Sequence, residues 1–397
     1  MDSKQTMPII TENELQEMRA VFKNEDFVEA ARSIRQSLVD IEDVILNIAV
    51  TGESGSGKST FINVIRGVED EDKDAAKTGV VETTVEPTPY SHPQHKNVHY
   101  WDLPGIGTPS FNARDYMKLV NFSQYDFFFI IASERFKDCH IQLAQAIHTM
   151  GKKFYFLRSK IDSDLNASRT RRRNSYNEEN ILKDIRNRCI QGLHEGGIKQ
   201  PQVFLLSCLE LDKYDFYNMQ KTLESELPSQ KRHVFLLSLP NIYKQALEKK
   251  KDALRNQIWK WASGYAISSL CARGDIATLV NTMTEFKEAF GLDERSLEKL
   301  AKTFGKELSD LKSVIRSPLV HQQMICEHDI NRELLSQDKA AIILMLKKYV
   351  ASLVPVIASM ADVGIAFGTA YWMLCSFLTD VADDAARVLS KALESSA

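Results

Sequence analysis

The chain has 397 residues, of which 44% are hydrophobic and 26% are charged, an ordinary composition for about two or three globular domains. Its 50 basic and 53 acidic residues give a net charge of −3, which argues against a dedicated nucleic-acid-binding protein, because such proteins usually carry a basic excess. The six cysteines include no CxxC pair, so the sequence predicts neither a disulfide framework nor a zinc site.

Residues 1–40 are predicted to form a helical segment. Its start, MDSKQTMPII, has neither the apolar run of a signal peptide nor a glycine after Met1, so we expect an intracellular protein without N-myristoylation. Two short helices are predicted on either side of residues 24–26. Apolar side chains recur there at helical spacing, namely Leu15, Met18, Val21 and Phe22, then Ala30, Ile34, Leu38 and Ile41.

A phosphate-binding loop is predicted at residues 52–59, GESGSGKS. The apolar strand-like run VILNIAV precedes it and the helical pattern STFINVIRGV follows, which is the context that this motif requires. The glycines let backbone N–H groups surround an anion, Lys58 would reach the β- and γ-phosphates, and the Ser59 hydroxyl would bind Mg²⁺. The predicted nucleotide contacts in this stretch are Gly52, Ser54, Gly55, Ser56, Gly57, Lys58, Ser59 and Thr60.

A mobile loop is predicted at residues 77–90, KTGVVETTVEPTPY. A GTPase needs a threonine here to complete the Mg²⁺ shell and to sense the γ-phosphate. Three threonines qualify and the sequence leaves the choice open. Thr78 and the adjacent Gly79 are predicted nucleotide contacts, and Thr83 and Thr84 are predicted metal ligands.

The stretch NVHYWDLPGIG predicts a strand that ends at Asp102, whose carboxylate would hold Mg²⁺, while the Gly105 N–H would contact the γ-phosphate. Ile106 follows, where many small GTPases have a water-positioning glutamine, so hydrolysis is expected to be slow or to be completed by another group. Glu82 is the nearest candidate; the alternative is that it is a solvated loop charge.

Guanine recognition is predicted at FYFLRSKIDSD, residues 154–164. The Asp162 carboxylate would accept from the guanine N1–H and exocyclic amine, and the Lys160 stem would lie along the base. Ser159 stands where Asn or Thr is usual, which leaves open whether a supporting hydrogen bond forms. The next strand, in PQVFLLSCLE, ends at Ser207 and Cys208, where a loop would close over the base.

The part of the chain after residue 235 is predicted to be helical, because strand-like runs disappear near residue 240. Helices at both chain ends should pack together as one domain. Residues 349–378 contain a single charge, Asp362, and are interrupted by Pro355, Gly364 and Gly368. This stretch is compatible with a buried helical pair, with an interfacial membrane-binding helix or with a membrane span.

Five stretches in order resemble the immunity-related GTPases, the interferon-inducible GTPase family: AVTGESGSGKSTFINVIRG, WDLPGIGTP, YDFFFIIASERF, KKFYFLRSKIDSDL and LPSQKRHVFLLSLPNI. The resemblance implies an α/β, Ras-like P-loop G domain, with a mostly parallel sheet covered by helices on both faces, and an all-α domain built from both chain ends. The corresponding ranges are 1–40, 41–235 and 236–397. Lys58 is typical of the GKS type of the family.

The resemblance also implies a function. It implies GTP and GDP as ligands with Mg²⁺, slow hydrolysis, and activation when G domains form a dimer or oligomer, with Glu82 as the switch glutamate. It implies that the partners are the same chain, related GTPases and the surface of endomembranes or pathogen-containing vacuoles in cell-autonomous immunity, and not nucleic acid. The alternative function is a GTP-binding scaffold with negligible hydrolysis.

Overall fold

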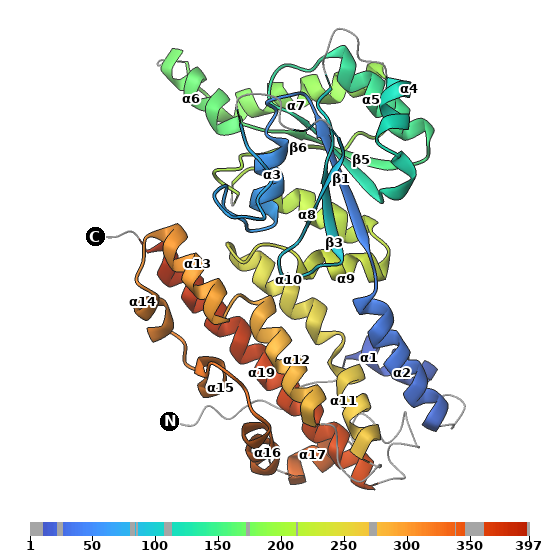
Figure 1. The fold of residues 1–397 in the computed structure, drawn as a ribbon, viewed down its shortest axis with the longest axis vertical. Helices are drawn as coiled ribbons and strands as arrows, with labels where there is room; N and C mark the ends of the chain where they lie inside the picture. Colours follow the sequence, from blue (N-terminus) through green and yellow to red (C-terminus); the bar gives the residue numbers. More distant parts are fainter. Residues whose placement is uncertain are drawn as a thin grey trace. The chain divides into compact units, whose positions relative to one another are not determined.

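The computed structural model describes residues 11–21, 27–79, 84, 86–106, 113–171, 175–211, 213–269, 276–337, 339–345 and 361–394. The chain divides into two compact units (Figure 1). The sheet unit comprises residues 44–240, and the helical unit comprises the chain up to residue 43 together with the chain from residue 241. The predicted boundaries, after residues 40 and 235, lie a few residues away.

The sheet unit contains six described strands, in the order β2-β3-β1-β4-β5-β6. Among the six described strands only β2 is antiparallel to its neighbour, so the predicted mostly parallel sheet is confirmed. The strands are β1 (Leu46–Gly52), β2 (Thr88–Ser91), β3 (Val98–Asp102), β4 (Phe127–Ala132), β5 (Lys153–Arg158) and β6 (Val203–Leu205).

Helices pack against both faces of this sheet, which explains the continuous apolar run of β4. Phe128 and Ile130 share a core cluster with side chains of α4, α5 and α7, whereas Phe129 faces the other way and its ring lies 5.3 Å from that of Phe61 in α3. The helices of this unit are α3 (Lys58–Ile65), α4 (Ala113–Leu119), α5 (Asp138–Thr149), α6 (Ile161–Arg171), α7 (Glu178–Glu195), α8 (Phe216–Glu226) and α9 (Ser229–Leu237).

The helical unit is formed around one long helix, α19 (Ala361–Leu393). This helix contacts every described helix from α10 to α17. The predicted all-α region is therefore confirmed. The other described helices are α1 (Glu12–Val21), α2 (Phe27–Glu42), α10 (Lys244–Arg255), α11 (Ile258–Ser268), α12 (Ile276–Ala289), α13 (Glu294–Phe304), α14 (Leu308–Ser313), α15 (Pro318–His321), α16 (Glu327–Ser336) and α17 (Lys339–Met345).

A buried polar network joins three distant parts of the chain in this unit. Arg255 of α10 donates to Glu14 of α1 at 2.6 Å and to the Tyr371 hydroxyl of α19 at 2.6 Å. The Tyr371 hydroxyl in turn donates to the Glu14 carboxylate at 3.2 Å. The Glu14 side chain is only 3% exposed, so these bonds compensate for the loss of water around its carboxylate.

Candidate functional site

The predicted motifs meet at one edge of the sheet, because they follow the carboxyl ends of parallel strands. A cavity of about 150 Å³ lies there. Each described residue that lines it is one that the sequence assigned to nucleotide, metal or catalysis: Ser54, Gly55, Gly57, Lys58, Ser59, Thr60, Thr78, Gly79, Thr84, Gly105 and Lys160.

The loop between β1 and α3 needs its glycines. A Cβ at Gly52, where φ is +147°, would lie 2.0 Å from the carbonyl oxygen of Ile131 in β4, so only glycine lets the loop pass this close. Gly57, with φ +93°, is the N-cap of α3. The first three residues of α3, Lys58, Ser59 and Thr60, line the cavity, and the N–H groups at the start of a helix have no acceptor within the helix and can bind an anion.

Lys58 is the cation of this loop and is largely buried. Its ammonium donates to the carbonyl oxygens of Glu53 at 3.0 Å and of Gly52 at 3.4 Å. These bonds hold the charge over the loop at the wall of the cavity. An anion in the cavity would therefore meet a cation that is already positioned.

Two of the predicted metal ligands, Ser59 and Thr84, contact a third, Asp102, at the end of β3. Its Oδ2 accepts from the Ser59 hydroxyl at 2.7 Å and from the Thr84 hydroxyl at 3.0 Å. Its Oδ1 is buried and has no hydrogen-bond partner among the described residues. Burial raises the pKa of Asp102, and the bond from Ser59 and the nearby Lys58 ammonium oppose this rise.

These oxygen donors fit Mg²⁺, which prefers carboxylate and hydroxyl ligands in phosphate sites. Of the two candidate threonines that the structure describes, Thr84 donates its hydroxyl to Asp102, while Thr78 is exposed and lines the cavity. Thr83 and the predicted switch residue Glu82 lie outside the described residues.

The predicted guanine motif at the end of β5 is tied to the phosphate loop. The Ser159 hydroxyl donates to the Ser56 carbonyl at 2.7 Å, and the Lys160 ammonium donates to the Gly55 carbonyl at 2.9 Å. Lys160 adopts a φ of +58°, a conformation that is uncommon outside glycine. Serine at position 159 thus makes the supporting bond that the sequence left open.

Asp162 lies in the first turn of α6, next to the loop after β6. The Ser163 hydroxyl donates to its carboxylate at 3.2 Å. Burial raises the pKa of the Cys208 thiol to about 12, and the Asp162 carboxylate contributes to this rise, so Cys208 is protonated at neutral pH. Ser207 is buried, and its hydroxyl accepts from the N–H of Leu209. The ends of β5 and β6 therefore bring Asp162, Ser207 and Cys208 together, as the sequence predicted.

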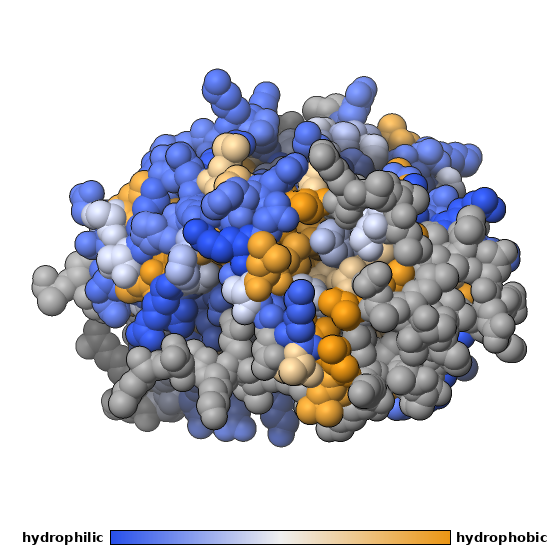
Figure 2. Space-filling model, turned by 90° about the horizontal axis from the view of Figure 1, so that it is seen from below, coloured by the Kyte–Doolittle hydropathy of each residue, from blue (hydrophilic) through white to orange (hydrophobic). Residues whose placement is uncertain are grey.

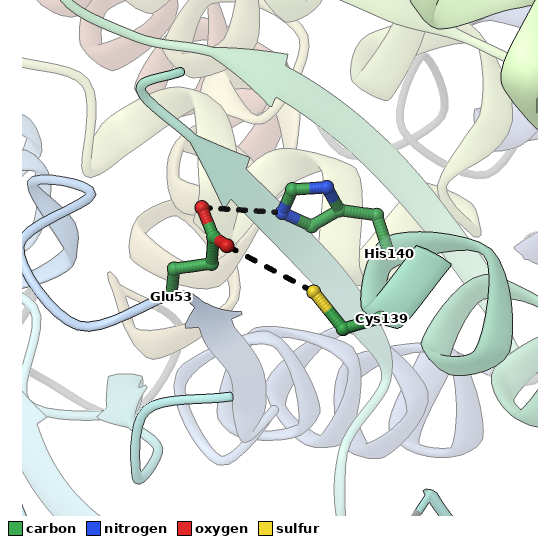
Figure 3. A group of neighbouring side chains, drawn as sticks. All are labelled: Glu53, Cys139 and His140. Atoms are coloured by element: carbon green, nitrogen blue, oxygen red, sulfur yellow. Dashed lines mark hydrogen bonds and ion pairs between the residues drawn. The ribbon is translucent and has the colours of Figure 1, made fainter. Parts of the chain in front are cut away.

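Sequence reasoning missed the environment of Glu53, the acidic residue inside the loop (Figure 3). Its carboxylate pairs with the Lys137 ammonium at 2.7 Å and accepts from the Cys139 thiol at 3.9 Å. The His140 Nε2 lies 3.8 Å from the same carboxylate. These three partners precede or begin α5, so they connect the phosphate loop to that helix.

The carboxylate, thiol and imidazole around Glu53 could suggest a metal site, but the hydrogen bonds argue against it. The His140 Nδ1 accepts from the Lys137 N–H at 3.1 Å, so the neutral ring carries its proton on Nε2, the atom that faces Glu53. A metal would need the lone pair of that nitrogen. Burial lowers the pKa of His140, which keeps the ring neutral, and Lys137 already neutralises the carboxylate.

The chain is similar to known proteins over nearly its whole length. The family profile described as Interferon-inducible GTPase matches residues 11–392. Interferon-inducible GTPase 5 of Rattus norvegicus is 41% identical over 98% of this chain and 85% of its own length. Interferon-gamma-inducible GTPase 10 of Mus musculus is 37% identical over 98% of this chain and 91% of its own length. Interferon-inducible GTPase 1 of Mus musculus is 43% identical over 72% of this chain and 71% of its own length.

Proposed function

The chain belongs to the interferon-inducible GTPase family, and we propose that it binds GTP with Mg²⁺ at the carboxyl edge of its sheet, hydrolyses it slowly and is activated when G domains associate. The convergence of Lys58, Ser59, Asp102 and Thr84 around one cavity is the observation that carries this proposal. GTPase activity as such follows from the family.

The residues in and around the cavity would have different roles in binding the nucleotide. Lys58 and the N–H groups of the loop would bind and orient the β- and γ-phosphates. Ser59, Thr84 and Asp102 would hold Mg²⁺, which when bound neutralises charge on the phosphate oxygens. Asp162 would select guanine, and Ser159 and Lys160 would fix the distance between the base and phosphate subsites.

The residues described so far do not account for how the attacking water is oriented. Among the described residues that line the cavity, none is a carboxylic acid or a glutamine. Ile106 is buried, and its N–H donates to the Gly52 carbonyl at 3.0 Å. A group that orients water must therefore come from elsewhere, and we propose Glu82 or a second G domain.

A GTP-binding scaffold with negligible hydrolysis is the second candidate function. The cavity lining favours it to the extent that no group on it orients water. The two functions differ in one measurable respect. In a self-activating GTPase the turnover per molecule rises with protein concentration, whereas in a scaffold it stays near zero at every concentration.

Asp162→Asn is expected to lower the preference for GTP over ATP by about 30-fold, because an amide cannot accept from both guanine donors as a carboxylate does. Competition binding with fluorescent GTP measures this ratio. Xanthosine triphosphate, whose 2-oxo group accepts from the new amide, should gain affinity. Asp164→Asn is the matched control, since Asp164 pairs with Arg158 at 2.6 Å, and undiminished selectivity in Asp162→Asn would reject the assignment.

We further propose peripheral contact with an intracellular membrane. Within α19, Val363–Leu393 is long and apolar enough to cross a membrane, but 61% of its most apolar window is buried in the fold. Figure 2 shows hydrophobic groups among hydrophilic ones at the end of the helical unit. In this unit the side chains of Leu335 in α16 and Leu344 in α17 are 79% and 61% exposed. Flotation with lipid vesicles tests this contact. Residues 346–360 lie outside the described residues.

A further inference from the structure

The hydroxyl of Tyr116 in α4 is part of a buried chain of hydrogen bonds. It donates to the carbonyl oxygen of Pro104 at 2.9 Å, and it lies 2.7 Å from the Thr51 hydroxyl at the end of β1. Since a carbonyl oxygen can only accept, the tyrosine proton points to Pro104, and Thr51 must donate to the tyrosine oxygen. Thr51, Pro104 and Tyr116 are all buried, so water does not replace these bonds.

The Pro104 carbonyl belongs to the same peptide group as the N–H of Gly105. A trans peptide is planar, and its C=O and N–H point in opposite directions. A bond that fixes the carbonyl therefore fixes the N–H as well. Gly105 lines the cavity together with Lys58, Ser59 and Thr84.

The neighbouring peptides are held by β1. The Leu103 N–H donates to the Val50 carbonyl and the Ile106 N–H donates to the Gly52 carbonyl, both at 3.0 Å. Proline has no N–H. Within the described part of the chain, the Gly105 N–H has no backbone acceptor, so it is the donor of this turn that remains for a ligand.

We propose that Tyr116 is a positioning residue for the γ-phosphate: its hydroxyl holds the Pro104–Gly105 peptide in the orientation that directs the Gly105 N–H into the cavity. The inference rests on the proposed function, in which this cavity binds GTP. Without the hydroxyl, the carbonyl loses its partner and the peptide can rotate, because glycine tolerates a wide range of backbone angles. The affinity for GDP, which has no γ-phosphate, is not affected by this rotation.

A purely structural role for Tyr116 has a different signature. The ring belongs to the core cluster of the sheet unit and lies 6.4 Å from that of Phe122. If the ring alone mattered, Tyr116→Phe would retain the packing and leave nucleotide preference unchanged. A loss of packing would instead weaken both nucleotides together.

Tyr125 provides a matched control. Its hydroxyl accepts from Gln124 at 2.8 Å and donates to the Val120 carbonyl at 2.9 Å, in the same core cluster but before the amino end of β4. Tyr125→Phe thus removes an equivalent buried bond, but the carbonyl that Tyr125 holds belongs to Val120, which is not among the described residues that line the cavity.

The experiment measures the affinity of the full chain for GDP and for a non-hydrolysable GTP analogue in the wild type, Tyr116→Phe and Tyr125→Phe. We expect Tyr116→Phe to lower the ratio of analogue to GDP affinity by about fivefold to tenfold, with GDP affinity retained, and Tyr125→Phe to leave the ratio unchanged. If Tyr116→Phe does not fold, Thr51→Val should lower the ratio by about twofold, because the tyrosine hydroxyl loses the donor that orients it, and Thr51→Ser should restore the ratio.

An unchanged ratio in Tyr116→Phe, or an equal fall in Tyr125→Phe, would overturn the inference while leaving the nucleotide site intact. A wild type that binds neither nucleotide would contradict the proposed function and the inference together. In the case where only Thr51 can be tested, equal ratios for Thr51→Val and Thr51→Ser would overturn the inference.

Discussion

Lys58→Ala is expected to reduce GTP turnover by about 100-fold or more, because it removes a cation that the fold positions over the phosphate loop. This ammonium donates to the carbonyls of Gly52 and Glu53 in its own loop, so we expect the free energy of unfolding to change little. Steady-state phosphate release measures the first effect, and thermal unfolding with and without GTP measures the second.

The control is Lys153→Ala. Lys153 begins β5 at the opposite edge of the sheet, where its ammonium pairs with Glu226 at 3.0 Å on the surface. Turnover in this variant should match the wild type. Retained turnover in Lys58→Ala would show that the cavity is not the catalytic site.

Arg255→Met is expected to lower the free energy of unfolding of the helical unit by about 3–5 kcal/mol, because it leaves the Glu14 carboxylate buried without its cationic partner. Chemical denaturation followed by circular dichroism measures this loss. The double variant Glu14→Gln, Arg255→Met should lose less than the sum of the two single variants, since each single change disrupts the same bonds.

Lys391→Met is the surface control for this network. Lys391 pairs with Glu394 at 2.7 Å near the end of α19, and such an exposed pair contributes little to stability because water and salt screen it. A loss in Arg255→Met no larger than in this control would show that the network does not stabilise the unit.

The phosphate loop was predictable because its signal is local. A buried strand, a glycine-rich turn and a helix follow one another without interruption, and steric rules fix the shape of the turn around Gly52 and Gly57. The ends of parallel strands then bring Asp102 and the Ser159 motif to the same edge, which the α/β architecture also implies.

The contacts made by Tyr116 and Glu53 could not be predicted in this way. Tyr116 meets Thr51 across 65 residues and Glu53 meets Cys139 across 86, and both pairings depend on how α4 and α5 pack on the sheet. The signals that could have suggested them were an acidic residue inside the phosphate loop and a tyrosine soon after the DLPG turn. Both are weak without the fold.

The apolar stretch 349–378 shows a limit of reading glycine as a helix breaker. Residues 361–378 lie within the continuous helix α19, and Gly364 and Gly368 are buried in it. Tertiary packing of the helix outweighs the low helix propensity of these glycines. The remainder of the predicted stretch, 349–360, is outside the described residues.

GTP turnover per molecule, measured over a hundredfold range of protein concentration, tests the central claim most directly. A self-activating GTPase requires the rate per molecule to rise with concentration and to vanish in Lys58→Ala at every concentration. A rate that stays flat and close to zero while GTP remains bound would contradict self-activation and leave the nucleotide-binding scaffold.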